Sequence, residues 1–345
     1  MGSAILLAEV KVISRLLTRK PIFIGFNVTN RCNMRCAFCS VPNLPNPDMT
    51  LPQVEHALDR VAEMGIPVVG VTGGEPFLRR DLADIMKAIE ARGLKTTLVT
   101  NGEALTQARI EELSGLRNIV HFALSVDSLD RNTYESLRGR KNLPETLTRF
   151  LNIRRFGPRT VYKLNVVVTP HNVDEIEAIV EFAVAAGLAL SFIPLNVGPG
   201  GFHRGQNDHG IDAAARQRMA DGFDTLRQLK LQGAPLWDHR DFYLMARRYL
   251  LGEPMGPCGA GELFLDLRSD GGLAFCNEME HVVSLLEVEH FTLKDLANIR
   301  KGWARRIDTC SKNQACCYTC SYNITATAQN LPAYLFDYLQ LRWRG

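Results

Sequence analysis

Three cysteines lie close together near the start of the chain, Cys32, Cys36 and Cys39, with the spacing C-x3-C-x2-C. Thiolates are the usual protein ligands of iron–sulfur clusters, and three of them directly after an apolar run suit such a cluster. A four-iron cluster held by three cysteines keeps one iron open, whereas a structural site normally closes all its positions. The loop therefore predicts a cluster with an open iron where chemistry takes place.

A zinc knuckle, or a set of buried structural thiols, is the competing interpretation of this loop. A structural zinc site is almost always tetrahedral, so it requires a fourth cysteine or histidine nearby. The next histidine along the chain is His56. The spacing therefore favours the cluster.

The composition describes a globular protein with a substantial core, because 46% of the 345 residues are hydrophobic and 22% are charged. The formal charge of +3 comes without a long basic block, so we expect no nucleic acid partner. No signal peptide precedes the nine cysteines, and their clustered spacing indicates metal ligands in a reducing compartment, so we expect a cytoplasmic protein. No apolar stretch approaches the roughly 18 residues that span a bilayer.

The elements that must position the cysteine loop alternate between strand-like and helix-like patterns. Strands are expected at 22–28, 68–71, 95–99, 119–126, 162–168 and 188–194, and helices near 51–64, 81–92, 107–113, 143–155 and 173–186, with a short helix near Arg131. Strands separated by helices of this length favour a parallel sheet, and six such units suit a partial (β/α)6 barrel of the α/β class. Ligands of such sheets bind outside the carboxyl ends of the strands.

The first cysteine motif, with Phe38 before its last cysteine, resembles the signature of the radical S-adenosylmethionine (SAM) superfamily. The resemblance implies that Cys32, Cys36 and Cys39 hold a four-iron four-sulfur cluster whose open iron chelates SAM. One electron from the reduced cluster then cleaves SAM, and the resulting 5′-deoxyadenosyl radical removes a hydrogen atom from the substrate. The resemblance also implies the partial barrel.

Residues at the strand ends resemble the SAM contacts of that family. Gly73, Gly74, Glu75 and Pro76 resemble its second motif, whose backbone binds the methionyl amino group, and paired glycines allow such a close approach. The same resemblance suggests Ser125 and Asp127 as ribose or carboxylate contacts and Arg138 as a carboxylate contact. Further candidates are Phe38, Asn101, Asn165, Asn172 and Asn196. A surface salt bridge for Arg138, and turn or capping roles for the asparagines, are the alternatives.

The C-terminal cysteines resemble the SPASM and twitch extensions that hold auxiliary clusters in many superfamily members. Cys258 and Cys276 flank two short expected strands around a turn at 268–272. The pattern departs from a full SPASM domain, since Ile307 replaces one cysteine and none follows Cys320. The resemblance therefore implies one auxiliary 4Fe–4S cluster, bound by Cys258, Cys276, Cys317 and Cys320, with Cys310 and Cys316 as alternates. A structural zinc bound by the same four thiols is the alternative.

We therefore expect five segments: an amphipathic helix at 1–20, the barrel at 21–210, a helical linker at 211–255, the SPASM/twitch-like domain at 256–325 and a C-terminal helix at 326–345. Residues 1–20 either pack on the barrel or contact a membrane surface peripherally. The glycine-rich stretch 196–210, with His203, Arg204 and His209, is either a linker or a mobile substrate loop.

The sequence thus predicts a radical SAM enzyme whose auxiliary cluster favours oxidation of the substrate or formation of a new bond. The substrate is a small metabolite, a lipid or a peptide, and the 31 residues before Cys32 are too few for the leader-binding domain of many peptide-modifying relatives. The expected reductant is a flavodoxin or ferredoxin. The alternatives are a radical SAM enzyme with a zinc-binding tail and a non-enzymatic iron–sulfur or zinc protein.

Overall fold

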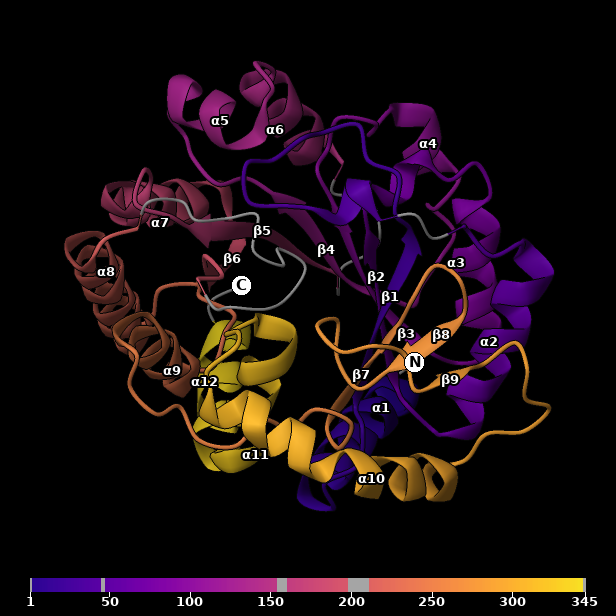
Figure 1. The fold of residues 1–345 in the computed structure, drawn as a ribbon. Helices are drawn as coiled ribbons and strands as arrows, with labels where there is room; N and C mark the ends of the chain where they lie inside the picture. Colours follow the sequence, from indigo (N-terminus) through magenta and orange to yellow (C-terminus); the bar gives the residue numbers. More distant parts are fainter. Residues whose placement is uncertain (1, 45–46, 154–159, 198–210, 344–345) are drawn as a thin grey trace.

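The computed structural model describes residues 2–44, 47–153, 160–197 and 211–343 (Figure 1). Six strands of its sheet run parallel in the order in which they occur along the chain, each paired with the next. They are β1 (Phe23–Thr29), β2 (Val68–Gly73), β3 (Lys95–Thr100), β4 (Ile119–Ser125), β5 (Val161–Val168) and β6 (Ala189–Pro194). The predicted α/β class and partial barrel are confirmed.

Helices connect these strands and lie on the outside of the sheet (Figure 1). They are α2 (Leu51–Glu63), α3 (Leu82–Ala91), α4 (Gln107–Glu111), α5 (Arg131–Arg138), α6 (Leu143–Asn152) and α7 (Ile176–Ala186), with single turns η1 (Val41–Asn43), η2 (Pro76–Leu78) and η3 (Val173–Glu175). The predicted helices therefore all occur, with shifted ends where capping and turn residues decide the boundary.

The two faces of the sheet differ in chemistry because side chains alternate along each strand. One face is apolar and fully buried, as at Ile24 and Phe26 of β1. The strand register places small or polar residues together on the other face, which lines the inside of the barrel: Gly25, Asn27, Gly70, Thr97, His121, Ser125, Lys163, Asn165 and Ser191. Apolar side chains such as Phe23, Val99 and Ile193 share this face, so its polar groups lie among apolar neighbours.

The sheet continues beyond the six-stranded unit. Strand β7 (Phe264–Leu267) pairs in parallel with β1, and β8 (Gly272–Ala274) and β9 (Val283–Ser284) follow it in antiparallel order. The predicted hairpin between Cys258 and Cys276 is present, but its attachment to β1 was not predicted. The second cysteine segment is therefore hydrogen-bonded to the strand that leads into the first cysteine loop.

The remaining helices are α1 (Gly2–Leu17), α8 (Ala213–Leu231), α9 (Arg240–Leu251), α10 (Leu293–Lys312), α11 (Ile324–Gln329) and α12 (Leu331–Trp343), with a π-helical turn η4 (Thr319–Asn323) before α11. Helices α8 and α9 were predicted and pack on each other. Helix α10 was missed, because only Leu296 and Ile307 of its 20 residues are buried, which leaves a weak apolar pattern. A capping box between Thr292 and Asp295 fixes its start.

Helix α1 forms within the segment where an amphipathic helix was predicted. Its last turns pack on the protein, since Leu16 is buried and the Arg15 guanidinium donates to the carbonyls of Pro21 (2.7 Å) and Met64 (3.1 Å). In the part of the chain that the structure describes, none of the helices is both long and apolar enough to cross a bilayer.

Candidate iron–sulfur and cosubstrate sites

The first cysteine loop begins where β1 ends, at the carboxyl edge of the parallel sheet. The backbone N–H of Met34 and the Asn101 amide donate to the Cys32 sulfur at 3.4 and 3.6 Å, and the Arg138 guanidinium lies 3.9 Å from the Cys36 sulfur. Burial raises the pKa of all three thiols, that of Cys39 to about 11, and their mutual repulsion adds to the shifts at Cys36 and Cys39. Three clustered thiols that face N–H donors suit the ligands of an iron–sulfur cluster. Binding of the cluster would deprotonate these thiols.

Gly73 and Gly74 allow the β2 loop to lie directly against the cysteine loop. A Cβ atom on Gly73 would lie 2.3 Å from the Thr29 carbonyl oxygen, and one on Gly74 would lie 2.1 Å from that of Arg31. The amides of Gly74 and Glu75 donate to the same two carbonyls at 2.7 and 2.8 Å. The glycines therefore serve the approach of two backbones, a role that the sequence interpretation assigned only to an approach to a ligand.

The carboxylate of Glu75 is fully buried and faces the protein. It accepts hydrogen bonds from the Thr100 hydroxyl (2.8 Å) and from the backbone N–H groups of Asn101 (2.7 Å) and Phe77 (3.1 Å). Burial raises the pKa of this carboxyl to about 7. These bonds join the ends of β2 and β3, so a cosubstrate contact near Glu75 would fall to the backbone of this loop rather than to its carboxylate. Asn101 reaches back to the cysteine loop by donating to the Asn33 side chain at 2.9 Å.

Asp127 and Arg138 form a buried ion pair beneath the cysteine loop. Arg138 Nε lies 2.6 Å from Asp127 Oδ2, and the Val167 N–H donates to Asp127 Oδ1 at 2.8 Å. The guanidinium also lies 5.8 Å from the centre of the Phe38 ring. Arg138 is thus salt-bridged but not on the surface, and it links β4 to the cysteine loop. For Asp127, Arg138 and Phe38, direct contact with SAM stays a prediction.

The other predicted polar candidates differ in how far the protein already engages them. The Asn172 side-chain amide donates hydrogen bonds to the backbone carbonyls of Asp127 and Val167. The Asn196 amide accepts from the Tyr249 hydroxyl and donates to that of Tyr318 at 2.8 Å, so protein groups occupy it. Ser125 and Asn165 pair across β4 and β5 on the interior face, and within the described residues the Asn165 side-chain oxygen is buried without a hydrogen-bond donor. The side chains of Ser125 and Asn165 therefore stay candidates for contacts with a bound ligand. His203, Arg204 and His209 lie outside the described residues.

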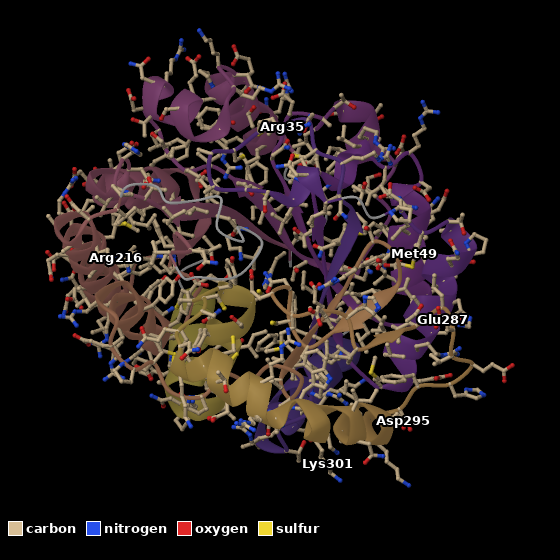
Figure 2. The ribbon with its side chains drawn as sticks, in the orientation of Figure 1. Arg35, Met49, Arg216, Glu287, Asp295 and Lys301 are labelled. Carbon is tan, nitrogen blue, oxygen red and sulfur yellow. The ribbon has the colours of Figure 1, made fainter. Side chains whose placement is uncertain are left out.

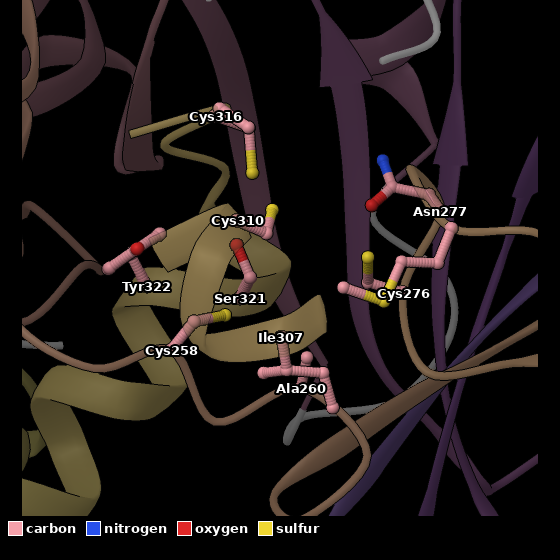
Figure 3. A pocket seen from close by; sticks show the side chains of 11 residues that line it. Cys258, Ala260, Cys276, Asn277, Ile307, Cys310, Cys316, Ser321 and Tyr322 are labelled. Carbon is pink, nitrogen blue, oxygen red and sulfur yellow. The ribbon is translucent and has the colours of Figure 1, made fainter. Parts of the chain in front are cut away.

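A second site is a small cavity between β8, α10 and the segment before α11 (Figure 3). Four cysteines line it, Cys258, Cys276, Cys310 and Cys316, and their sulfur atoms point toward a common space. Burial raises the pKa of each thiol, that of Cys258 to about 12, and the neighbouring thiols raise those of Cys258, Cys276 and Cys316 further. We call this space the four-thiol cavity. Four thiolates are a usual ligand set of a fully coordinated iron–sulfur cluster, so the four-thiol cavity is a candidate site for one.

The cavity brings together a set of cysteines that differs in part from the predicted ligand set. Cys310 and Cys316, expected as alternates, line the cavity, whereas Cys317 and Cys320, expected as ligands, do not. Cys316 and Cys317 are adjacent in the sequence, and only Cys316 lines the cavity. Burial, together with the charges of Asp266, Glu278 and Cys258, raises the pKa of the Cys320 thiol to about 12. Among the described residues, no group of three His, Cys, Asp or Glu side chains is arranged so that it could hold a single metal ion.

Asp266 on β7 is a candidate functional residue that the sequence interpretation missed. It is 6% exposed, it faces the barrel interior opposite Gly25, and the Asn27 amide at 3.5 Å is its hydrogen-bond contact within the described residues. Burial raises the pKa of this carboxyl to about 7. An acid inside the apolar run Phe264–Leu267 was the available signal.

The structure resembles solved proteins over most of its length, at identities that establish the fold alone. SuiB of Streptococcus suis, solved with its precursor peptide SuiA, superposes with a TM-score of 0.60 at 17% identity, over 85% of this chain and 70% of SuiB. The protein anSMEcpe with bound AdoMet superposes with a TM-score of 0.63 at 15% identity, over 94% of this chain and 100% of its own.

Curated relatives match a shorter stretch. AdoMet-dependent heme synthase of Methanosarcina barkeri is 27% identical over 227 residues, 64% of each protein. GTP 3′,8-cyclase of Aquifex aeolicus is 31% identical over 188 residues, 51% of this chain and 57% of the relative. The chain therefore spans less than two thirds of the length of these two relatives.

Residues 26–183, which run from β1 into α7 and include the first cysteine loop, match the family model described as the Radical SAM superfamily. Members of this family bind a 4Fe–4S cluster and SAM, in agreement with the thiols and strand ends found here. Residues 26–183 of the chain therefore form a radical SAM domain.

Proposed function

We propose that this protein is a radical SAM enzyme with one auxiliary 4Fe–4S cluster, held in the four-thiol cavity, and that it oxidises its substrate or forms a new bond in it. When bound, the first cluster and SAM would supply the 5′-deoxyadenosyl radical that removes a hydrogen atom from the substrate. The four-thiol cavity is the observation that carries the proposal, because a substrate radical needs an electron acceptor to end as an oxidised product.

The position of the four-thiol cavity supports this role. Strand β7 precedes the cavity residue Cys276 and is hydrogen-bonded along β1, which leads into Cys32. The polar interior face of the barrel, with Asn27 and Asp266, lies on these same two strands. The two cysteine sites and this face of the barrel are therefore connected through the same pair of strands.

Contacts within the protein position the first cysteine loop and the strand-end loops beside it. Arg138 is fixed by Asp127 and directs a positive charge to the Cys36 sulfur, which favours its thiolate form. Glu75 holds the β2 and β3 loops, and Gly74 seats the former against the cysteine loop. Ser125 and Asn165 offer polar groups on the barrel interior for the cosubstrate or substrate.

The iron content tests the number of clusters. Protein purified and reconstituted without oxygen is expected to contain about eight iron atoms per chain, since each cubane holds four. A value near four would contradict the two-cluster proposal. Product analysis tests the reaction: one 5′-deoxyadenosine per product is expected, and catalytic reuse of SAM would argue against net oxidation.

Single substitutions test the ligand set of the auxiliary cluster. Cys316→Ser is expected to lower the iron content from about eight to about four atoms per chain. The matched variant Cys317→Ser removes the neighbouring buried thiol and is expected to retain eight. The reverse pattern would restore the assignment made from the sequence pattern.

A zinc-binding tail is the second candidate, because four cysteines are a common ligand set of structural zinc. Metal analysis of a variant with Cys32, Cys36 and Cys39 replaced by alanine separates the two: iron with sulfide supports the cluster, and one zinc supports the tail. A non-enzymatic metal protein would fail to cleave SAM under dithionite.

The substrate proposal keeps a peptide beside a small metabolite or a lipid. SuiB and anSMEcpe were solved with peptides, which favours a peptide, whereas the heme synthase and the GTP cyclase are named for small molecules. Anaerobic incubation with separate metabolite, lipid and peptide pools, followed by 5′-deoxyadenosine formation, identifies the class.

A further inference from the structure

Helix α10 carries a stripe of basic side chains along its full length. Lys294, Lys301, Arg305 and Lys312 follow one another at intervals of seven, four and seven residues, which places them on one face of an α-helix. All four are exposed. Over 20 residues the helix is about 30 Å long, so the stripe crosses a surface of protein-interface size.

Few acids neutralise this stripe. Lys312 pairs with Asp308 at 2.7 Å, while the side chains of Lys294, Lys301 and Arg305 make no ion pair within the described part of the chain. Asp295 is engaged in the helix cap with Thr292.

Helix α10 contains six basic and two acidic residues, a net charge of +4, whereas the whole chain carries +3. The rest of the protein therefore carries a net charge of −1, and the basic excess of the whole chain is concentrated on helix α10.

The opposite face of the same helix lines the four-thiol cavity. Ile307 and Cys310 reach into it, and Ile307 is buried. Figure 3 shows both side chains beside Cys258 and Cys276, and Figure 2 shows Lys301 directed away from the protein. A helix with its side chains is about 10–12 Å thick, so a protein docked on the basic stripe would lie about one helix diameter from the thiols.

We propose that the basic stripe of α10 is the docking surface of an acidic one-electron carrier protein that exchanges electrons with the auxiliary cluster. This inference rests on the proposed function, because it requires a cluster in the four-thiol cavity. Charge complementarity selects an acidic partner, and the short path through α10 selects a redox protein over other acidic partners.

The exchange is a transfer of single electrons. With flavodoxin as the carrier, its anionic hydroquinone loses one electron and becomes the neutral semiquinone without gaining or losing a proton, and the oxidised auxiliary cluster gains that electron. During substrate oxidation the direction reverses, because the cluster must give the electron of each turnover to an oxidised carrier.

The test uses the full chain with Cys32, Cys36 and Cys39 replaced by alanine, so that the auxiliary cluster is the one cluster present. Flavodoxin hydroquinone is mixed with this protein anaerobically, and semiquinone formation is followed by stopped-flow absorbance. In this background, Lys301→Glu with Arg305→Glu is expected to slow reduction at low ionic strength by 10-fold or more, because steering contributes about 10- to 1,000-fold to association rates. The difference should vanish near 1 M salt, where the Debye length is about 3 Å.

The matched control applies the same charge change elsewhere. Arg216→Glu with Arg218→Glu lies on α8, which Figure 2 shows at a different edge of the molecule, and it is expected to leave the rate within about twofold. Iron content and circular dichroism of both variants must equal those of the background protein.

The possible outcomes separate the two proposals. Absence of iron–sulfur signal from the background protein would overturn the proposed function and this inference with it. An intact cluster that flavodoxin does not reduce, or that is reduced equally fast in the α10 variant, would overturn the docking surface alone. Equal slowing in the α8 variant would show a general charge effect and would also overturn it.

Discussion

Replacing Asp266 by asparagine should make the protein more stable at alkaline pH. Each of the other buried carboxylates of the barrel has strong partners: Glu75 accepts three hydrogen bonds, Asp127 pairs with Arg138, and Asp238 accepts from Ser191 and Phe192. In the part of the chain that the structure describes, Asp266 has one hydrogen-bond contact, Asn27 at the limiting distance of 3.5 Å. Its ionised form is therefore poorly solvated.

The magnitude follows from the pKa of this carboxyl. Burial, with help from the charges of Glu278 and Asp270 and against that of Arg268, raises the pKa from 3.8 to about 7 in the folded chain. Because the folded-state pKa is the higher one, the stabilisation from proton binding is complete below pH 3.8 and is lost as the pH rises through 7. The full loss is about 4 kcal/mol, and about 3 kcal/mol of it falls between pH 5 and pH 8.5.

The assay is urea unfolding of the metal-free chain, since bound clusters would break two-state behaviour. The free energy of unfolding of Asp266→Asn, minus that of the unsubstituted chain, is expected to increase by about 3 kcal/mol from pH 5 to pH 8.5. The control is Asp174→Asn, whose side chain is 82% exposed, and it should show no comparable pH dependence. A difference for Asp266 that stays constant or decreases would refute the view that this carboxyl is desolvated inside the barrel.

Two further substitutions test the support of the first cysteine loop. Asp127→Asn leaves the buried Arg138 charge without its partner and should cost about 3–5 kcal/mol of unfolding free energy, whereas Asp174→Asn, which breaks an exposed pair, should cost no more than about 1 kcal/mol. Gly74→Ala places a Cβ atom 2.1 Å from the Arg31 carbonyl oxygen and should cost about 1–3 kcal/mol and lower the iron content of the first site, whereas Gly115→Ala, which meets nothing within 4 Å, should do neither. Urea unfolding and iron analysis measure both, and a normal iron content in Gly74→Ala would contradict the close packing of the two loops.

Local sequence patterns were sufficient to predict the barrel, because each strand and helix has a hydrophobic periodicity of its own. The six parallel strands and the hairpin at β7 and β8 formed where apolar runs and turn residues predicted them. Helix α10 escaped prediction, because tertiary contacts bury only two of its residues and its outer face is polar. The pairing of β7 with β1 joins residues more than 230 positions apart, and no local pattern encodes such a register.

The sequence by itself was enough to predict the chemistry of the first site, because the C-x3-C-x2-C spacing and the strand-end loops are local features. Tertiary structure alone decided which thiols share the second site and which polar residues are already engaged. Cys316 and Cys317 are neighbours in sequence, yet only Cys316 lines the cavity with Cys258. Asp127 and Asn196 resembled free ligand contacts, yet Arg138 and two tyrosines occupy them. The reason is that side-chain direction and long-range partners are fixed by packing, which a spacing pattern does not contain.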